Sequence, residues 1–398
     1  MNLASIFSSV AHKKMAAVDL PQNGSNQHEI NGVSALKELF GTSQTTKGKI
    51  RWHYFSDDRD PEHYSDSFTF YDARAKGSVR TGRSEWRFYY SGKFLERVRE
   101  GDLLVIVCDR KGAFDALLLE KESGWERAVR QLFQLEATGP SFRTLSHESL
   151  VRKDLGFLER KVLEEIGFAD DLPVVVSDED TVLGAFGGEF PSTKAMSAFA
   201  RSHVETGDSD PDETLTAWIS REEELFKALE NVIVLKRLRE GFDNTEDFVR
   251  FSLSVLNRRK SRMGHALQNH LEEIFKRHRL RFTPQARTER NNSPDFIFPG
   301  EREYHNPIFD QSLLVMLGVK SSAKDRWRQI LAEADRIPQK HLFTLEPGIS
   351  VSQTSEMMEK RVQLVIPKVL HATYRTEQLG IIRSLADFIS YVRCKNPA

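Results

Sequence analysis

The stretch that decides the fold of the second half of the chain reads Leu313-Leu314-Val315-Met316-Leu317-Gly318-Val319-Lys320. Its apolar run is almost continuous, which is typical of a strand buried on both faces of a sheet. A charged side chain follows only at the end of the run, where a strand can emerge from the core. The stretch therefore predicts a buried strand inside a layered α/β domain, with Lys320 at its end.

Similar patterns extend outward from this strand in both directions. Further strand-like segments lie at residues 296–298, 341–345 and 362–366. Helical spacing of apolar residues covers residues 220–239, 245–257, 264–278, 325–334, 354–361 and 381–393. Because strands alternate with helices, the second half predicts an α/β domain with a mixed central sheet flanked by helices.

The first half is rich in β-strand signals. Aromatic-rich segments lie at residues 51–55, 67–71 and 86–90, and residues 103–108 and 114–120 predict a hairpin around Asp109-Arg110-Lys111-Gly112. Helical spacing follows at residues 125–135 and 150–166. Half a dozen short strands predict a barrel or sandwich.

Domain boundaries follow from these patterns. Residues 1–30 are polar and rich in small side chains, so we expect them to be poorly ordered. Gly184, Gly187, Gly188 and Pro191 predict a connector. We therefore expect a β-rich domain at residues 1–180, a linker at residues 181–205 and the α/β domain at residues 206–398.

Composition excludes several classes of protein. The 398 residues carry 39% hydrophobic side chains, enough for two or three domains of roughly 100 to 200 residues each. Cys108 and Cys394 are the only cysteines, which excludes a disulfide scaffold and a cysteine-based zinc site. The chain lacks a secretory start and any run of about 18 apolar residues, so we expect a cytoplasmic protein without a membrane partner.

The net charge of −1 hides a strongly uneven distribution. Residues 205–230 hold nine acidic side chains against two basic ones. Residues 251–290 hold ten basic side chains and three acidic ones, an excess of 10 − 3 = 7 positive charges. Part of this basic stretch is a solvated helix face, but its size favours contact with nucleic-acid phosphates.

The chemistry-bearing residues are Asp295 before one strand, Lys320 at the end of another and Glu333 in the following helical segment. Two carboxylates suit a hard divalent cation such as Mg²⁺, which prefers oxygen ligands. A lysine can orient water and stabilise negative charge during metal-assisted phosphodiester hydrolysis. The common nuclease pattern places an acid two residues before the lysine, and Gly318 stands there. Glu333 must then supply the second carboxylate, unless it is only a surface residue of its helix.

Several runs in the second half resemble one nuclease family in their order and identity. They are residues 210–213, 257–262, 282–286, 294–296, 304–305, 319–320, 324–331, 333–335 and 341–345. The set, from about residue 205 to 370, resembles the catalytic domain of EcoRII-type restriction endonucleases of the PD-(D/E)xK superfamily. In that branch the second carboxylate follows the lysine after twelve residues, the separation of Lys320 and Glu333 here.

This resemblance implies roles for individual residues. Asp295 and Glu333 are expected to bind Mg²⁺, Lys320 is expected to be the catalytic lysine, and Glu272 is expected to be an additional acidic neighbour of the metal. Tyr304 lies in a motif shared with the family and is included among the catalytic candidates, either positioning a phosphate or packing.

The resemblance also implies DNA-contacting residues. Lys324, Asp325 and Arg326 occupy the positions that read C and G bases in the family, and these side chains have the matching donors and acceptors. Arg326 alternatively pairs with acids on its own helix. Arg258 and Arg262 of the basic stretch are expected to contact phosphates.

The first half resembles, more weakly, the family's effector domain, a DNA-binding pseudobarrel. Arginines interleaved with aromatic residues on β-structure suit phosphate and base contact. The arginines expected to contact DNA are Arg74, Arg80, Arg83 and Arg87, which otherwise form a solvated loop.

The sequence thus predicts a Mg²⁺-dependent type II restriction endonuclease, of the IIE class that a second DNA site regulates. Its expected substrate is a short double-stranded DNA palindrome with CC and GG flanks around a central A·T or any pair. A homodimer is expected because each active centre cuts one strand. A companion methyltransferase would act on the same site without needing to bind this chain. The alternatives are a catalytically silent DNA-binding regulator and a nuclease for RNA or damaged duplexes.

Overall fold

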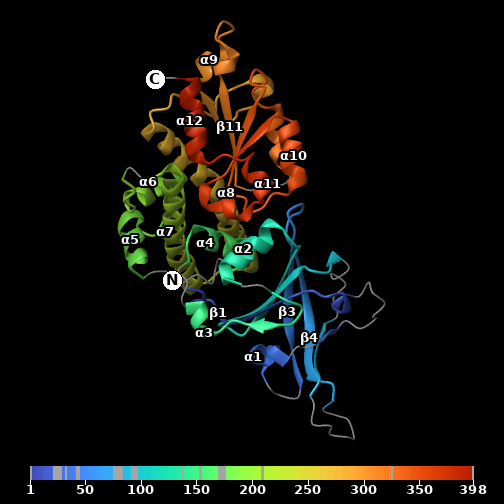
Figure 1. Ribbon diagram of the computed structural model, residues 1–398. Coiled ribbons are helices and arrows are strands. Elements are labelled where there is room, and N and C mark those ends of the chain that lie inside the picture. Colours follow the sequence, from blue (N-terminus) through green and yellow to red (C-terminus); the bar gives the residue numbers. More distant parts are fainter. Residues whose placement is uncertain are drawn as a thin grey trace. The chain divides into compact units, whose positions relative to one another are not determined.

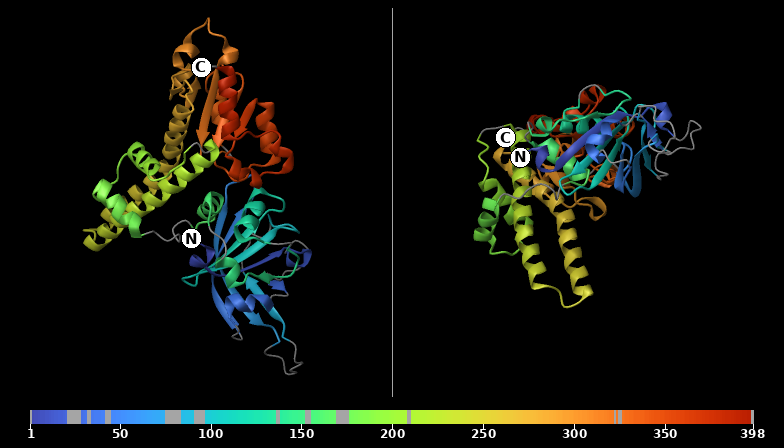
Figure 2. Two further views of the ribbon diagram at one scale, coloured as in Figure 1. Left: turned by 60° about the vertical axis from the view of Figure 1, so that its left-hand side comes forward. Right: turned by 90° about the horizontal axis from the view of Figure 1, so that it is seen from below.

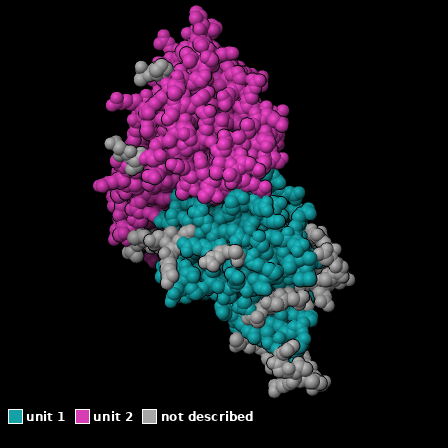
Figure 3. Space-filling view, in the orientation of Figure 1, with its two compact units in different colours: residues 1–173, 347–350 teal, residues 174–346, 351–398 magenta. Residues whose placement is uncertain are grey.

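The computed structural model divides the chain into two compact units (Figure 3). Unit 1 comprises residues 1–173 and 347–350, and unit 2 comprises residues 174–346 and 351–398. The structure describes residues 2–20, 29–31, 34–41, 45–74, 84–90, 97–135, 138–151, 155–168, 176–207, 210–321, 323 and 326–396.

Unit 1 contains one eight-stranded sheet in the order β2-β5-β4-β3-β7-β6-β1-β8 (Figure 1). Its strands are β1 (Phe7–Lys14), β2 (Glu29–Asn31), β3 (Thr45–Phe55), β4 (Glu62–Asp72), β5 (Trp86–Tyr90), β6 (Leu103–Asp109), β7 (Phe114–Leu119) and β8 (Arg143–Thr144). Its helices are α1 (Lys37–Phe40), α2 (Gly124–Phe133), α3 (His147–Val151) and α4 (Phe157–Glu165). The strands β6 and β7 form the expected hairpin, and β3 and β7 pair in parallel.

The expectation of a poorly ordered start is wrong for residues 2–20. Strand β1 pairs with β6 and β8 and lies inside the sheet. Phe7, Val10 and Ala11 are fully buried, and the Lys13 ammonium is neutralised by Asp19 at 2.7 Å. The strand reads Phe-Ser-Ser-Val-Ala-His-Lys-Lys and lacks a continuous apolar run, so its composition resembled that of a disordered terminus.

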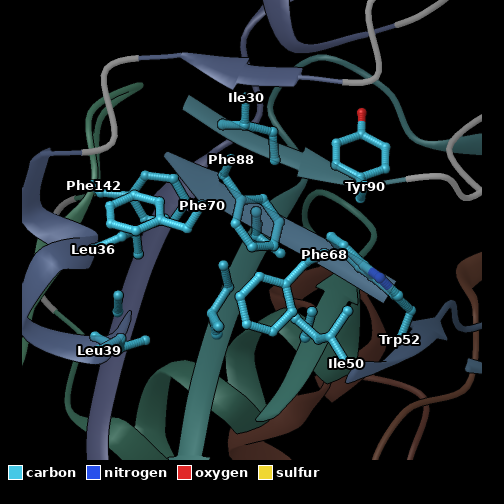
Figure 4. Packing of buried hydrophobic residues seen from close by; sticks show 14 of the residues in the cluster. Ile30, Leu36, Leu39, Ile50, Trp52, Phe68, Phe70, Phe88, Tyr90 and Phe142 are labelled. Carbon is cyan, nitrogen blue, oxygen red and sulfur yellow. The ribbon is translucent and has the colours of Figure 1, made fainter. Parts of the chain in front are cut away.

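An aromatic cluster forms the core on one face of this sheet. Phe68, Phe70 and Phe88 lie together from neighbouring strands, with Trp52 and Tyr90 beside them (Figure 4). The ring centres of Phe68 and Phe88 are 5.5 Å apart, within the range of favourable aromatic contact. The aromatic residues of the predicted strands therefore pack together on one face of the sheet.

Unit 2 is built on a five-stranded mixed sheet in the order β13-β12-β11-β10-β9. The strands are β9 (Thr283–Pro284), β10 (Phe296–Phe298), β11 (Val315–Lys320), β12 (Lys340–Thr344) and β13 (Val362–Val365). Strand β11 is central, antiparallel to β10 and parallel to β12. The decisive stretch thus forms the buried strand that its composition predicts.

Some helices of unit 2 flank this sheet. Others, which precede the sheet in the sequence, form a separate helical layer (Figure 1). They are α5 (Val176–Phe186), α6 (Thr193–Ser202), α7 (Pro211–Glu240), α8 (Thr245–Arg277), α9 (Glu301–His305), α10 (Val351–Glu359), α11 (Thr376–Leu379) and α12 (Leu385–Lys395). The segment 181–205, expected to be a linker, lies largely in α5 and α6, which pack with α7 around Leu225 and Phe226. No helix in the described ranges is long and apolar enough to cross a membrane.

Two expected helices near residue 264 are one continuous helix, α8. A Cβ at Gly264 would meet nothing within 4 Å, so the glycine is a half-buried helix position with room for a side chain. A glycine there costs about 1 kcal/mol relative to alanine but does not break a long helix.

The α-helix expected at residues 325–334 is a 3-10 helix, η9 (Trp327–Ala332). Its two fully buried side chains, Trp327 and Ile330, are three residues apart. Residues at this spacing lie directly above one another in a 3-10 helix, so both pack on the sheet.

Candidate active site

Asp295 lies at the start of β10, where the sheet holds its carboxylate in place. Its side chain is only 8% exposed. Oδ2 accepts a hydrogen bond from the backbone N–H of Val319 at 2.6 Å, and Oδ1 accepts one from the Gln285 amide at 3.1 Å. The Gln268 amide, from α8, also donates to Oδ1. The carboxylate is therefore fixed against the end of β11, beside Lys320.

Burial raises the pKa of Asp295 above its ordinary value. The Val319 N–H, the Lys320 charge and the Gln285 amide act in the opposite direction and favour the ionised form. A buried carboxylate with donors and a cation aimed at it is arranged to carry negative charge inside the protein.

Lys320 ends β11 and is half-buried. Gly318, two residues earlier, is in close contact with η9: a Cβ there would lie 2.7 Å from Cγ2 of Ile330. An acidic side chain would need the space that Ile330 fills. Tight packing thus explains why no carboxylate occupies this position, and it places η9 directly on the strand that carries the lysine.

Glu333 follows η9 immediately, and its carboxyl interacts electrostatically with Asp295 and Lys320. Burial raises the pKa of its carboxyl, the charge of Lys320 lowers this pKa, and the charge of Asp295 raises it. Among the described residues, the buried Oε2 of Glu333 has no hydrogen-bond partner. Two carboxylates and one lysine therefore converge, with one carboxylate oxygen left for a ligand.

The backbone that carries Glu333 is held by Lys340, the first residue of β12. Nζ of Lys340 donates to the carbonyl oxygens of Glu333 and Ala334 at 2.5 and 2.6 Å. Ala334 has a φ of 51°, in the left-handed region that a residue with a side chain rarely adopts. Lys340 is 6% exposed, so its ammonium serves this turn and not the solvent.

Tyr304 supports the other side of the same turn. It lies in α9, is 1% exposed and packs against Ala334. Its hydroxyl donates to Glu289 at 2.5 Å, in the 3-10 helix η7 (Glu289–Asn291), and Glu289 also accepts from the N–H of Asp335 at 3.1 Å. Of the two roles considered for Tyr304, these contacts favour packing.

Glu272 lies on α8, one turn beyond Gln268. Its carboxylate pairs with Lys276 at 2.5 Å, a contact between neighbouring turns of one helix. The charges that shift the pKa of Asp295 and of Glu333 do not include Glu272. The structure thus pairs Glu272 within its own helix, and its role as a neighbour of the metal stays a prediction.

The expected phosphate-binding arginines of α8 lie against aromatic rings. The Arg258 guanidinium is 4.2 Å from the Phe190 ring centre, and that of Arg262 is 4.6 Å from the Phe226 ring centre. Arg262 is 7% exposed. These positions suit cation–π packing of the helical layer better than contact with a phosphate.

The structure describes only one of the three residues expected to read bases. Arg326 is exposed at the start of η9. Lys324 and Asp325 lie outside the described residues.

In unit 1, Arg74 and Arg87 share one carboxylate. Both bind Glu85, each at 2.8 Å, and together they lower the pKa of its carboxyl. Arg80 and Arg83 lie outside the described residues.

Gln268, Gln285 and Lys340 were not among the site residues predicted from the sequence. Gln285 belongs to a run that resembles the family, but an amide has no chemical signature of its own. Lys340 begins a buried strand, and only the fold reveals that its ammonium reaches the Glu333 turn.

The donor set fits a hard divalent cation. No three Asp, Glu, His or Cys side chains within the described ranges form a ready metal cage. Asp295 and Glu333 offer carboxylate oxygens, and Oε2 of Glu333 has no hydrogen-bond partner in the part of the chain that the structure describes. Mg²⁺ is commonly bound by one or two protein carboxylates, and water and phosphate oxygens fill its remaining coordination positions.

Comparison with known proteins identifies relatives of this region. Residues 226–389 match the family model described as EcoRII C terminal. Over 202 residues the chain is 45% identical to the type II restriction enzyme EcoRII of Escherichia coli. The aligned region is 50% of each protein. The match thus spans about half the length of that curated relative.

Solved structures give a more distant likeness. Two structures of metal-depleted Ecl18kI in complex with uncleaved DNA, one of them with modified DNA, are each 15% identical in sequence. They cover 56% of this chain and 85% and 86% of those chains, with TM-scores of 0.46 and 0.45.

Proposed function

We propose that this chain, whose residues 226–389 belong to the EcoRII C-terminal family of restriction endonucleases, is a type II restriction endonuclease that hydrolyses double-stranded DNA. The observation that carries the proposal is the convergence of Asp295, Lys320 and Glu333: the charge of Lys320 acts to lower the pKa of both carboxyls, and the charge of Asp295 acts to raise that of Glu333.

In this function Asp295 and Glu333 would hold a Mg²⁺ ion. When bound, such an ion polarises the phosphate and lowers the pKa of a water. Lys320, whose charge acts on both carboxylates, would orient the water and stabilise the negative charge that develops on the phosphate. The hydrogen bonds from the Val319 N–H and the Gln285 amide favour the ionised form of Asp295, against the effect of its burial.

The DNA sequence that the enzyme recognises is proposed to be a short palindrome with CC and GG flanks. Arg326 is exposed at the start of η9, where it could donate to a guanine, and the neighbouring Lys324 and Asp325 would complete the reading of a G·C pair. A palindrome has two-fold symmetry, so we propose a homodimer with one active centre for each strand. A cell carrying such an enzyme needs a methyltransferase that modifies the same site.

Unit 1 is proposed to be the effector domain, a pseudobarrel-type DNA-binding fold whose occupation activates unit 2. Arg74, which follows β4, and Arg87, on the neighbouring strand β5, support this role because both bind Glu85. Glu85 holds their guanidinium groups in a fixed orientation. Fixed guanidinium groups lose less conformational entropy when they bind phosphate.

Sequencing the ends of plasmid fragments tests the proposal. Purified full-length chain is incubated with unmethylated plasmid and Mg²⁺, with and without a short site-containing duplex. We expect discrete fragments whose ends share one CC/GG-flanked sequence. Specific DNA binding without cleavage under any divalent metal would instead identify a silent regulator.

A further inference from the structure

Two histidines of unit 1 face each other across strands β3 and β4, away from the proposed active centre. The two strands lie side by side (blue in Figure 2), and their antiparallel register places His53 opposite His63. Nδ1 of His53 lies 2.7 Å from Nδ1 of His63. His53 is 7% exposed and His63 is exposed, so the pair is anchored in the sheet and reaches solvent on one side.

A buried carboxylate fixes the inner of the two rings. Nε2 of His53 lies 2.7 Å from Oδ1 of Asp115, a fully buried residue of β7. Arg51 binds the same carboxylate through two nitrogens, at 2.8 and 2.9 Å. Burial acts to raise the pKa of Asp115, but the hydrogen bonds from His53 and Arg51 lower it below its ordinary value. Asp115 is therefore ionised at neutral pH and can only accept hydrogen bonds.

The ionised carboxylate determines which nitrogen of His53 carries a proton. Because Asp115 only accepts, Nε2 of His53 is the donor in their contact. Nδ1 of the neutral ring is then a bare acceptor, and it points at Nδ1 of His63. Burial, and next the charge of His53, lower the pKa of His63 below its ordinary value. This shift favours the neutral form of His63, the form in which imidazole binds metal ions.

The contact between Asp115 and His53 is the support that metal-binding histidines usually have. Such a histidine binds the metal through one ring nitrogen and donates its other N–H to a carboxylate, which orients the ring and makes the ligand more basic. Here the supported nitrogen faces a second imidazole. A metal ion can replace the single proton between the rings, because His63 can carry that proton on Nε2 instead.

The distance between the two nitrogens is close to what a metal needs. A zinc ion about 2.1 Å from each nitrogen would hold them roughly 3.4 Å apart at the tetrahedral angle. That separation is roughly 0.7 Å more than the present one, and the exposed ring of His63 can turn to provide it. No third His, Cys, Asp or Glu completes a metal cage in the part of the chain that the structure describes, so water would fill the remaining positions.

We propose that His53 and His63 form a zinc site in unit 1, with Asp115 as the positioning residue behind His53. Imidazole nitrogen suits Zn²⁺, whereas Mg²⁺ prefers oxygen ligands, so this site differs in chemistry from the carboxylates of unit 2. A bound ion would join β3 to β4 and stabilise the folded chain. The proposal does not depend on the proposed function.

Isothermal titration of the metal-free, full-length chain with Zn²⁺, in excess Mg²⁺, tests this site. We expect the wild-type chain to bind one more Zn²⁺ ion than His63→Ala. The matched control is His147→Ala, which removes another exposed histidine of unit 1 and should bind as wild type does. Wild-type and His63→Ala chains that bind equal numbers of Zn²⁺ ions with equal Kd overturn the proposal.

Cu²⁺ as a spectroscopic probe tests the ligands and the role of Asp115. The electron paramagnetic resonance spectrum of the wild-type chain should show two coordinated imidazole nitrogens that His63→Ala lacks. Asp115→Asn should keep this spectrum and raise the Kd for Zn²⁺ by ~10- to 100-fold, the usual effect of losing the carboxylate behind a metal-binding histidine. An unchanged Kd in Asp115→Asn would overturn its positioning role.

Thermal melts keep the site testable if Asp115→Asn does not fold. Zn²⁺ should raise the Tm of the wild-type chain and of His147→Ala, because a ligand that binds only the folded state stabilises it. The Tm of His63→Ala should rise less. Equal rises in all three chains would contradict the site at His53 and His63.

Discussion

Nζ of Lys340 lies 2.5 Å from the backbone carbonyl oxygen of Glu333, so a buried lysine on β12 fixes the turn that presents a proposed metal-binding carboxylate. Lys340 touches the backbone of this turn, which makes it a positioning residue. The same ammonium also binds the carbonyl of Ala334, whose left-handed conformation makes the turn sharp.

Replacing Lys340 by Met should lower cleavage ~10- to 100-fold, the usual effect of losing a group that orients a metal ligand. The loss should appear in kcat and in the Mg²⁺ concentration required, with little change in DNA affinity. Lys340→Arg should recover part of the activity because it keeps donors for both carbonyls. Arg328→Ala, which removes an exposed ion pair with Glu356, serves as the control. Equal losses in both variants would contradict a positioning role.

Glu333→Gln should make the protein more stable at pH 8 while abolishing cleavage. Burial raises the folded-state pKa of Glu333 above its unfolded value, so ionisation costs stability as the pH rises through this window. The gain in Tm should shrink as the pH falls and disappear below about 4.3, the pKa of an unperturbed glutamate. Thermal melts from pH 4 to 8 measure it, and a variant less stable than wild type at pH 8 would show that the carboxylate is not held under strain.

Gln285→Ala should move the acidic limb of the cleavage profile to higher pH. The Gln285 amide lowers the pKa of Asp295 by hydrogen bonding to its ionised form, so its loss raises that pKa further. More of the carboxyl is then protonated at a given pH below the plateau. The pH dependence of kcat, with Gln339→Ala as a control on the surface, checks the shift. An unchanged profile would mean that Asp295 does not set the acidic limb.

Gly318→Ala should destabilise unit 2 by about 1 to 3 kcal/mol and reduce cleavage, because the new methyl group would lie 2.7 Å from Cγ2 of Ile330. The strain would displace η9 and with it Glu333. Ile330→Leu removes the methyl group at that point, so it should restore activity in the double variant. Additive losses in the two single variants and the double variant would argue against this contact.

The sequence predicted the sheet of unit 2 because its signals are local. The apolar run ending at Lys320 could be buried only as a central strand, and the hairpin of β6 and β7 was marked by its turn. The strand β1 was missed because it mixes Ser, His and Lys with its few apolar residues and so shows no apolar run. The 3-10 character of η9 depends on where Trp327 and Ile330 meet the sheet, which no local pattern records.

The candidate site was predictable in its charged residues and not in its supports. Asp295, Lys320 and Glu333 carry a chemistry that fixed residue types at fixed spacing can indicate. The partners that hold them, Gln268 and Lys340, come from a distant helix and a neighbouring strand. Their roles depend on tertiary contacts alone.

The most direct test of the central claim compares plasmid cleavage by the wild-type chain and by Lys320→Ala in the presence of Mg²⁺ and a site-containing duplex. We expect the wild-type chain to cut at one sequence, and Lys320→Ala to bind that sequence with unchanged affinity without cutting it. Cleavage by Lys320→Ala at the wild-type rate would contradict the assignment of the active centre to Asp295, Lys320 and Glu333.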